Sequence, residues 1–394
     1  MSATVTSSAF SGTSGAKFSQ GPPETRAVLL RGAGLLPVLA GMALLASCAS
    51  APPPGPAAPS PEESRALIER LLPGSVPDRA KWVAALYDGF ASHSLAPTPE
   101  RICAVEAVVE QESSFRVNPV VRGMGNIAMR EIEGRAARAG VPLVIVHTAL
   151  QLNSSNGRSY EERIKGAKTE KDLSDIYEDF IGRVPMGRTL FESRNPIRTR
   201  GPMQVNVAFA SEYSADHTYP YPIKGSIADE LFTRRGSVYF GIAHLLDYQA
   251  PYDSYLYRFA DFNAGQYSSR NAAFQTALGI ASGTSVVTDG ALLPHDDKAG
   301  EPGGTELAVR SLARRLDLSE SEIHTDLQQG RTRDFEHTNT YKGVFALAER
   351  QAGRSLPKAV VPRIVLRGPK ISRALSTDWY AHRVDGRFRS CLKR

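Results

Sequence analysis

The chain has 394 residues, of which 42% are hydrophobic and 22% are charged. This composition is typical of a globular protein with ample core, in one large domain or two. The formal net charge of +6 is only mildly basic and no dense stripe of Lys and Arg occurs, so a nucleic-acid-binding protein is not expected.

The N-terminus has the pattern of an export signal. Arg26 and Arg31 precede an uncharged apolar stretch, residues 32–45, that is short for a membrane span. It ends in Leu45-Ala46-Ser47-Cys48, which resembles the bacterial lipoprotein signal. The resemblance implies that residues 1–47 are removed and that Cys48 receives lipid (palmitate among it). With Ala49 in the next position, it also implies the periplasmic face of the outer membrane in a Gram-negative bacterium. An uncleaved anchor, or an ordinary signal peptide with a chance Cys, is the alternative.

Six prolines between residues 51 and 61 predict an extended tether over residues 48–62. Two helical patterns follow, at 63–72 and 78–92, with Pro73-Gly74 between them.

The next predicted helix, residues 99–112, ends in an acidic residue that we single out. Thr98 is a suitable N-cap and Pro99 suits the first helical position. At 3.6 residues per turn Glu112 shares the apolar face of Val105, Val108 and Val109, whereas Glu106 and Glu110 point away from it. Burial and the negative end of the helix dipole both favour the neutral acid, which near pH 7 could protonate a glycosidic oxygen. A partly buried Glu held by hydrogen bonds or by an Arg is the alternative.

Residues 118–198 have the pattern of a helical insertion. Helices are expected around 127–139, 144–151, 159–167 and 172–181, although Leu143–Val146 could instead form a short buried strand. A helix is expected over 227–248, and 255–260 continues the helical pattern into Asp261.

Residues 281–304 are loop-like, and helices are expected around 305–316, from Ser319, and at 340–351. The last 40 residues are basic and irregular, with possible strand at 360–361 and 363–366. The sequence therefore predicts a mainly α protein, with a core domain at 63–284 and a C-terminal helical extension at 285–394 that packs on the core.

Four short motifs occur in one order along the chain. They are Glu112-Ser113, Gly201-Pro202-Met203-Gln204, the helix from Gly236 to Leu246, and Phe262-Asn263-Ala264-Gly265. In this order they resemble the landmarks of the soluble lytic transglycosylase and goose-type lysozyme superfamily, which implies a lysozyme-like core. In detail the chain also resembles an uncharacterised family of proteobacterial lipoproteins with such a core.

The resemblance implies a role for each matching residue. Glu112 matches the single catalytic acid and base, and Ser113 matches a residue that contacts substrate. Met203 and Gln204 match the turn that floors the groove. Asn263 matches the Asn that orients the intermediate, beside Phe262.

Three departures from the family pattern affect the expected activity. The segment between Glu112 and Gly201 is roughly 70 residues longer than in typical members. Pro202 stands where Leu is usual. Phe262 stands where Tyr is usual, and it lacks a hydroxyl. Asp261 is a candidate second carboxylate, which would favour hydrolysis, but a helix-capping role suits it better.

Beyond Cys48, the cysteines are Cys103 and Cys391, which either form a disulfide that ties the C-terminal tail to the helix of Glu112 or remain free thiols. No metal-binding pattern occurs, so neither metal nor cofactor is expected. Tyr219 and Tyr221 are weaker candidates for sugar stacking, with ordinary core or surface tyrosines as the alternative.

The sequence thus predicts a lipid-anchored lytic transglycosylase whose partners are peptidoglycan glycan strands and, through the lipid, a membrane. It would cleave the bond between N-acetylmuramic acid and N-acetylglucosamine. The alternatives are a hydrolytic lysozyme on the same fold and a non-catalytic peptidoglycan-binding envelope lipoprotein. An accessory of outer-membrane assembly or secretion has only the lipid signal in its favour.

Overall fold

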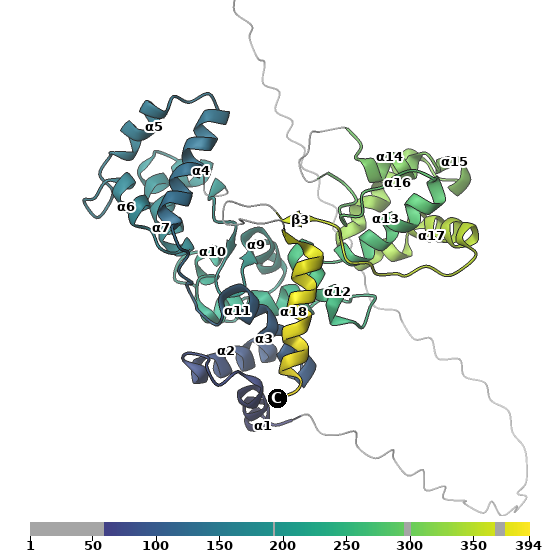
Figure 1. Ribbon diagram of the computed structural model, residues 1–394, viewed down its shortest axis with the longest axis horizontal. Coiled ribbons are helices and arrows are strands. Elements are labelled where there is room, and N and C mark those ends of the chain that lie inside the picture. The colour runs from purple at the N-terminus through teal and green to yellow at the C-terminus, as the bar shows by residue number, and fades with distance from the viewer. Residues whose placement is uncertain (1–58, 192–193, 295–300, 367–374) are drawn as a thin grey trace, which may run out of the picture. The chain divides into compact units, whose positions relative to one another are not determined.

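The computed structural model describes residues 59–191, 194–294, 301–366 and 375–394 (Figure 1). The predicted signal peptide, Cys48 and most of the tether lie outside these residues. The described part is mainly helical, as predicted, and its strands form two short antiparallel pairs. No described helix is both long enough and apolar enough to cross a bilayer.

The described elements follow one another in this order: α1 (Pro61–Leu71), α2 (Arg79–Ser92), α3 (Pro99–Ser113), α4 (Met124–Arg138), α5 (Leu143–Leu150), α6 (Tyr160–Gly166), α7 (Glu170–Arg183), α8 (Gly187–Phe191), β1 (Thr199–Arg200), β2 (Val205–Asn206), α9 (Val207–Asp216), α10 (Ile227–Glu230), α11 (Arg234–Leu246), α12 (Tyr255–Ala264), α13 (Ser268–Ser282), α14 (Gly304–Arg310), α15 (Ala313–Leu316), α16 (Glu320–Gln328), η2 (Gln329–Arg331), η3 (Arg333–His337), α17 (Asn339–Ala352), β3 (Val365–Leu366), β4 (Leu375–Ser376) and α18 (Thr377–Cys391).

The largest buried core joins α1, α2, α3, α11, α12 and α18. Trp82, Phe240 and Phe259 are fully buried within it. The helix predicted over 227–248 is in fact two helices, because Ser226 caps α10 and Thr233 caps α11 through their side chains. Because α18 belongs to this core, the predicted core domain includes a helix from the C-terminal end of the chain.

A second core is formed by α13 with α14, α16 and α17. Phe274, Phe335 and Tyr341 pack on one another in it, with ring centroids 5.0 to 5.9 Å apart. Since α13 contributes to this core, the second group of helices begins before the predicted boundary at residue 284.

The predicted insertion contains a small core of its own, built from α4, α6 and α7. The segment at 143–146 forms a helix, α5, and not the alternative buried strand. None of the side chains of α5 is buried, and Val144 is 71% exposed. The apolar composition of residues 143–146 suggested a buried strand, but this segment is not part of a core.

The motif at 201–204 forms the tight turn between β1 and β2, which pair through Thr199↔Asn206 and Arg200↔Val205. Gly201 has φ +74°, and a Cβ there would lie 1.8 Å from the carbonyl oxygen of Leu231. Only glycine allows this close approach of two backbones.

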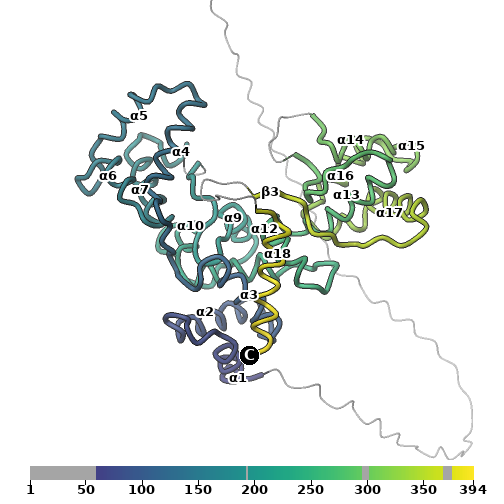
Figure 2. Tube along the Cα trace, in the orientation of Figure 1, coloured from purple at the N-terminus to yellow at the C-terminus, as the bar shows by residue number. Residues whose placement is uncertain are grey.

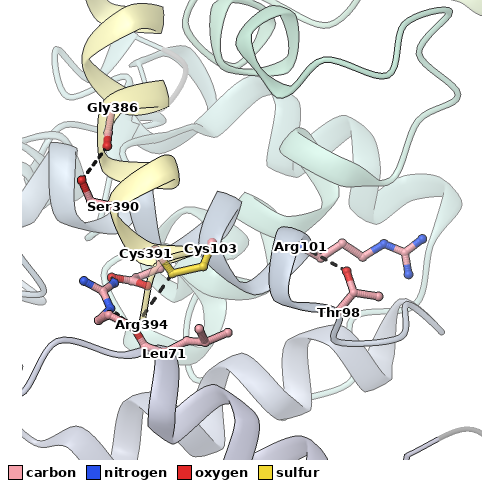
Figure 3. Close-up of a disulfide and its surroundings, with 9 residues drawn as sticks. Leu71, Thr98, Arg101, Cys103, Gly386, Ser390, Cys391 and Arg394 are labelled. Carbon is pink, nitrogen blue, oxygen red and sulfur yellow. Dashed lines mark hydrogen bonds and ion pairs between the residues drawn. A yellow bond between two sulfur atoms is a disulfide. The ribbon is translucent and has the colours of Figure 1, made fainter.

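Residues 355–364 have no regular structure, but residues 377–391 form α18, a 15-residue helix whose N-cap, Ser376, accepts a hydrogen bond from the backbone of Trp379. The short pair β3–β4 precedes it. Figure 2 shows α18, in yellow, running beside α3 and α12, and its packing on both is extensive. A disulfide joins Cys103 of α3 to Cys391 of α18, across a sequence separation of 288 (Figure 3).

Glu106, which was expected on a face of α3 away from Glu112 and its valines, is buried on that face as well. The helix is buried on nearly all sides, and Glu106 is only 1% exposed. Its carboxylate accepts a hydrogen bond from Arg394, which also donates to the carbonyl of Leu71 at 2.6 Å. Burial, only partly offset by Arg394, raises the pKa of Glu106 to about 7. Part of the surface of α3 away from Glu112 is covered by α18.

The raised pKa of Glu106 predicts a pH-dependent stability. In the unfolded chain Glu106 titrates near its ordinary pKa of 4.5. Between pH 4.5 and pH about 7 the folded state therefore binds more protons than the unfolded state, and the free energy of unfolding falls as the pH rises. Wild type should lose about 2–3 kcal/mol relative to Glu106→Gln between pH 5 and pH 8. Urea unfolding at four pH values measures this difference. A constant difference would show that Glu106 ionises in the folded state as it does in the unfolded state.

Candidate functional site

Glu112 lies in the last turn of α3 and is half-buried. Just beyond it the chain turns through two residues with positive φ, Ser114 and Phe115. Phe115 is buried against Trp82, with ring centroids 5.2 Å apart, so the end of α3 is anchored in the core. Ser113, the predicted substrate contact, is 6% exposed and donates its hydroxyl to the Val109 carbonyl at 3.0 Å. That hydroxyl thus serves the helix itself.

Tyr380 of α18 faces Glu112. Its side chain is 5% exposed, and its hydroxyl makes no direct hydrogen bond of good geometry to any described residue. Burial and the nearby Glu112 carboxyl raise the pKa of Tyr380 far above its usual range. The phenol therefore keeps its proton at neutral pH, and it is available as a donor to Glu112 or to a group bound beside it.

Asn263 is held by the same turn of α18. Its side-chain oxygen accepts a hydrogen bond from Thr377 Oγ1 at 2.9 Å. Thr377 and Tyr380 are three residues apart on one helix and are therefore neighbours on its surface. The C-terminal helix thus brings together the environments of Glu112 and Asn263, two residues that are 151 positions apart in the sequence.

Phe262 and Asn263 lie in the last turn of α12, not in a turn after it, and Gly265 ends the helix at φ +111°. Phe262 is 9% exposed and packs edge-on against His244 of α11, with ring centroids 5.0 Å apart. Burial lowers the pKa of His244 to about 4, so this imidazole is neutral at physiological pH.

Met203 is fully buried in the same core as Val105, Val108 and Phe262. Its backbone N–H donates to Ser237 Oγ at 3.0 Å. Its sulfur would lie 2.2 Å from a Cβ at Gly241, so α11 needs glycine there for Met203 to fit. The 201–204 turn is thereby fixed to the helix that also supports Phe262.

Gln204 is turned towards the insertion. Its amide nitrogen donates to Glu170 of α7 at 2.8 Å, and its oxygen accepts from Thr199 at 3.0 Å. Nearby, Arg200 pairs with Glu178 of α7 at 3.3 Å. The insertion therefore braces the hairpin that carries the motif.

Asp261 is fully buried and caps the start of α13, which is the role that the sequence favoured. Its carboxylate accepts hydrogen bonds from the backbone N–H groups of Tyr267 and Ser269, at 3.1 and 2.7 Å, at the start of α13. The hydroxyls of Tyr248 and Tyr252 donate to it as well. A carboxylate with four donors has little capacity left to activate a water molecule.

A cavity of about 780 Å³ lies elsewhere, between α2, α7, α10 and the start of α11. Of the residues singled out in the sequence, only Tyr221 lines it. Tyr219 instead donates its hydroxyl to Glu230 at 2.8 Å and stacks on Phe240 with ring centroids 5.2 Å apart.

Within the described residues, the one group of potential metal ligands that converges is Cys103, Glu106 and Cys391. The two sulfur atoms are bonded to each other, and the carboxylate is paired with Arg394. These three residues therefore do not suit a metal ion in this state.

Thr377 and Tyr380 are the residues that sequence reasoning missed. A signal was present, because Tyr380, Val384, Phe388 and Cys391 recur at helical spacing and Ser376 is a good N-cap. The basic character of the tail concealed this apolar stripe.

Comparison with known proteins gives a family but no activity. Residues 75–394 match the family model described as "Protein of unknown function (DUF1615)". The chain is 47% identical over 357 residues to "Uncharacterized protein YaiW" of Escherichia coli (strain K12), which covers 90% of this chain and 97% of that protein. No solved structure shows a significant match.

Proposed function

The chain belongs to the DUF1615 family, and we propose that this member is a peptidoglycan lytic transglycosylase with a lysozyme-like core. The observation that supports this most is the convergence on one turn of α18. Tyr380 faces Glu112, while Thr377 binds Asn263. A half-buried carboxyl beside a buried phenol and an amide is a suitable set for acid–base chemistry on an acetamido sugar.

The proposed reaction uses one carboxyl twice. Glu112 in its neutral form donates its proton to the glycosidic oxygen while the bond from that oxygen to the anomeric carbon breaks. The acetamido oxygen of the sugar stabilises the positive carbon, so a second carboxylate is not required. The ionised Glu112 then removes the proton from the sugar's own 6-hydroxyl, whose oxygen attacks the anomeric carbon. The product carries a 1,6-anhydro end, and no water is consumed.

The proposal assigns a role to each residue near Glu112. The Asn263 amide, fixed by Thr377, orients the acetamido group. Tyr380 steadies Glu112 when the carboxyl becomes ionised. Asp261 takes no part, because its oxygens are already bonded.

Two other functions stay open to test. A hydrolytic lysozyme would place a water molecule where the 6-hydroxyl is proposed to attack. A non-catalytic binder is favoured by Phe262 and by the engagement of Gln204 with Glu170. The proposal also includes a lipid on Cys48 and the periplasmic face of the outer membrane, and radiolabelled palmitate with a Cys48→Ser control tests the lipid.

Digestion of purified sacculi tests the proposed function. Wild type should release soluble muropeptides from them. Binding without release, measured by sedimentation with the sacculi, would favour the non-catalytic binder.

Replacement of Tyr380 by Phe should leave the fold intact and lower kcat by about 10- to 100-fold, the effect of one lost hydrogen bond to a charged group. Without the phenol the ionised form of Glu112 is less stable, so the alkaline limb of the pH–rate profile should move to higher pH. Steady-state rates on sacculi from pH 5 to pH 9 measure both effects.

Tyr341→Phe is the matched control, since Tyr341 is equally buried (7% exposed) but lies in the second core. An unchanged pH profile in Tyr380→Phe would contradict the assigned role.

A further inference from the structure

The cavity between α2, α7, α10 and α11 has a positively charged wall. Five cationic side chains line it: Lys81, Lys171, Lys224, Arg234 and Arg235. Three acids line it as well. At about 780 Å³ its size is that of a small-molecule or peptide site.

The three acids already have partners. Glu230 is 4% exposed and accepts two hydrogen bonds from Arg235, both at 3.1 Å. Asp229 caps α10 by accepting from the backbone N–H of Ser226 at 2.9 Å. Asp88 pairs with Arg65 at 3.3 Å. Little negative charge in the wall is therefore left to attract a cation.

The five cations are compensated to different degrees. Lys171 donates to both carboxylate oxygens of Asp175, at 2.8 and 2.7 Å, and Arg235 is paired with Glu230. Lys81 and Arg234 share one carboxylate, Asp78, at 3.4 and 3.2 Å. The Nε of Arg234 is buried, and no described residue accepts a hydrogen bond from it. Lys224 is exposed and pairs with no carboxylate in the part of the chain that the structure describes. The part of the wall formed by Lys81, Lys224 and Arg234 thus favours an anionic ligand.

The cavity borders the hairpin that carries Met203. Gln204 binds Glu170, and the next residue, Lys171, lines the cavity. Likewise Gly201 packs against the carbonyl of Leu231, and the preceding residue, Glu230, lines the cavity. A ligand in the cavity would therefore contact the residues next in sequence to Glu170 and Leu231, and these two residues make the contacts that position the 201–204 turn.

We propose that this cavity binds a carboxylate-bearing peptide stem of peptidoglycan. The assignment rests on the proposed function, because that function makes a sugar with attached acidic peptides the substrate. The cationic wall would receive the carboxylates, and the ring of Tyr221, with Arg235 5.3 Å from its centroid, offers an apolar face to the peptide. Substrate strands with stems would then bind more tightly than bare glycan.

Calorimetric titration tests this assignment with the full chain carrying Glu112→Gln, so that nothing is cleaved. The probes are a disaccharide-tetrapeptide from peptidoglycan, the same fragment with its carboxyls amidated, a peptide-free chitotetraose, and inorganic phosphate. Lys81→Ala with Lys224→Ala should weaken binding of the acidic fragment about tenfold and leave chitotetraose unchanged. The control is Lys342→Ala with Lys358→Ala, two exposed lysines on or after α17 whose loss gives the same change in net charge.

An unchanged affinity for the acidic fragment, or an equal loss for chitotetraose, would overturn the assignment. So would phosphate that binds as tightly as the fragment and displaces it, since the cavity would then be a general anion site. These outcomes concern binding alone. If sacculi are not cleaved but the fragment binds through its carboxyls, the proposed catalysis fails and the assignment of the cavity holds.

Discussion

Replacement of Glu112 by Gln should abolish the release of muropeptides from sacculi while the protein keeps its fold and its binding to glycan. The amide has nearly the same shape as the carboxyl but can neither donate the first proton nor accept the second. General acid–base catalysis by one group typically contributes 10²- to 10⁴-fold, and here one group serves both steps. The rate should therefore fall by at least about 10³-fold, measured by chromatography of the soluble products.

Glu110→Gln is the matched control for this experiment. Glu110 lies two residues earlier on α3, is also half-buried, and forms an ion pair with Arg387 of α18 at 2.5 Å. It should change stability by no more than about 1 kcal/mol and should leave activity within a few fold of wild type. If both variants lose activity equally, the loss comes from the packing of α3 against α18 and not from the chemistry of Glu112.

Removal of the disulfide with Cys103→Ser and Cys391→Ser should lower the free energy of unfolding by about 2–5 kcal/mol, because the bridge closes a very long loop of the unfolded chain. It should also lower activity, since α18 carries Thr377 and Tyr380. Urea unfolding and steady-state rates on the same samples measure the two effects.

Wild type treated with a thiol reductant under mildly destabilising conditions should approach the stability of the double variant. Reduction should be slow in the native state, because Cys103 and Cys391 are 0% and 1% exposed. A double variant with the stability and activity of wild type would show that core packing and the ion pairs of Arg387 and Arg394 hold α18 in place without the disulfide.

The sequence predicted local structure well where the signals were local. Thr98 and Pro99 define the start of α3, as their positions indicated, and Ser319 caps α16 through the backbone of Glu322. The capping role of Asp261 was also predicted correctly. These features depend on residues a few positions apart, where helix geometry leaves few alternatives.

The features that the sequence missed depend on distant partners. Glu106 is buried because α18, almost 300 residues later, covers that side of α3. The same helix supplies Tyr380 to Glu112 and Thr377 to Asn263. Helical periodicity shows which residues share a face, but it does not show which element packs on that face. The assignment of Glu112 rested on a motif, and its neighbours became visible only in three dimensions.

The most direct test of the account is the mass of the products that wild type releases from sacculi in water enriched in ¹⁸O. The proposed chemistry predicts glycan ends that are lighter by one water than hydrolysed ends and that contain no ¹⁸O, with none released by Glu112→Gln. Reducing ends that carry ¹⁸O would show hydrolysis instead, and the absence of any released product from wild type would leave a glycan-binding protein without the proposed activity.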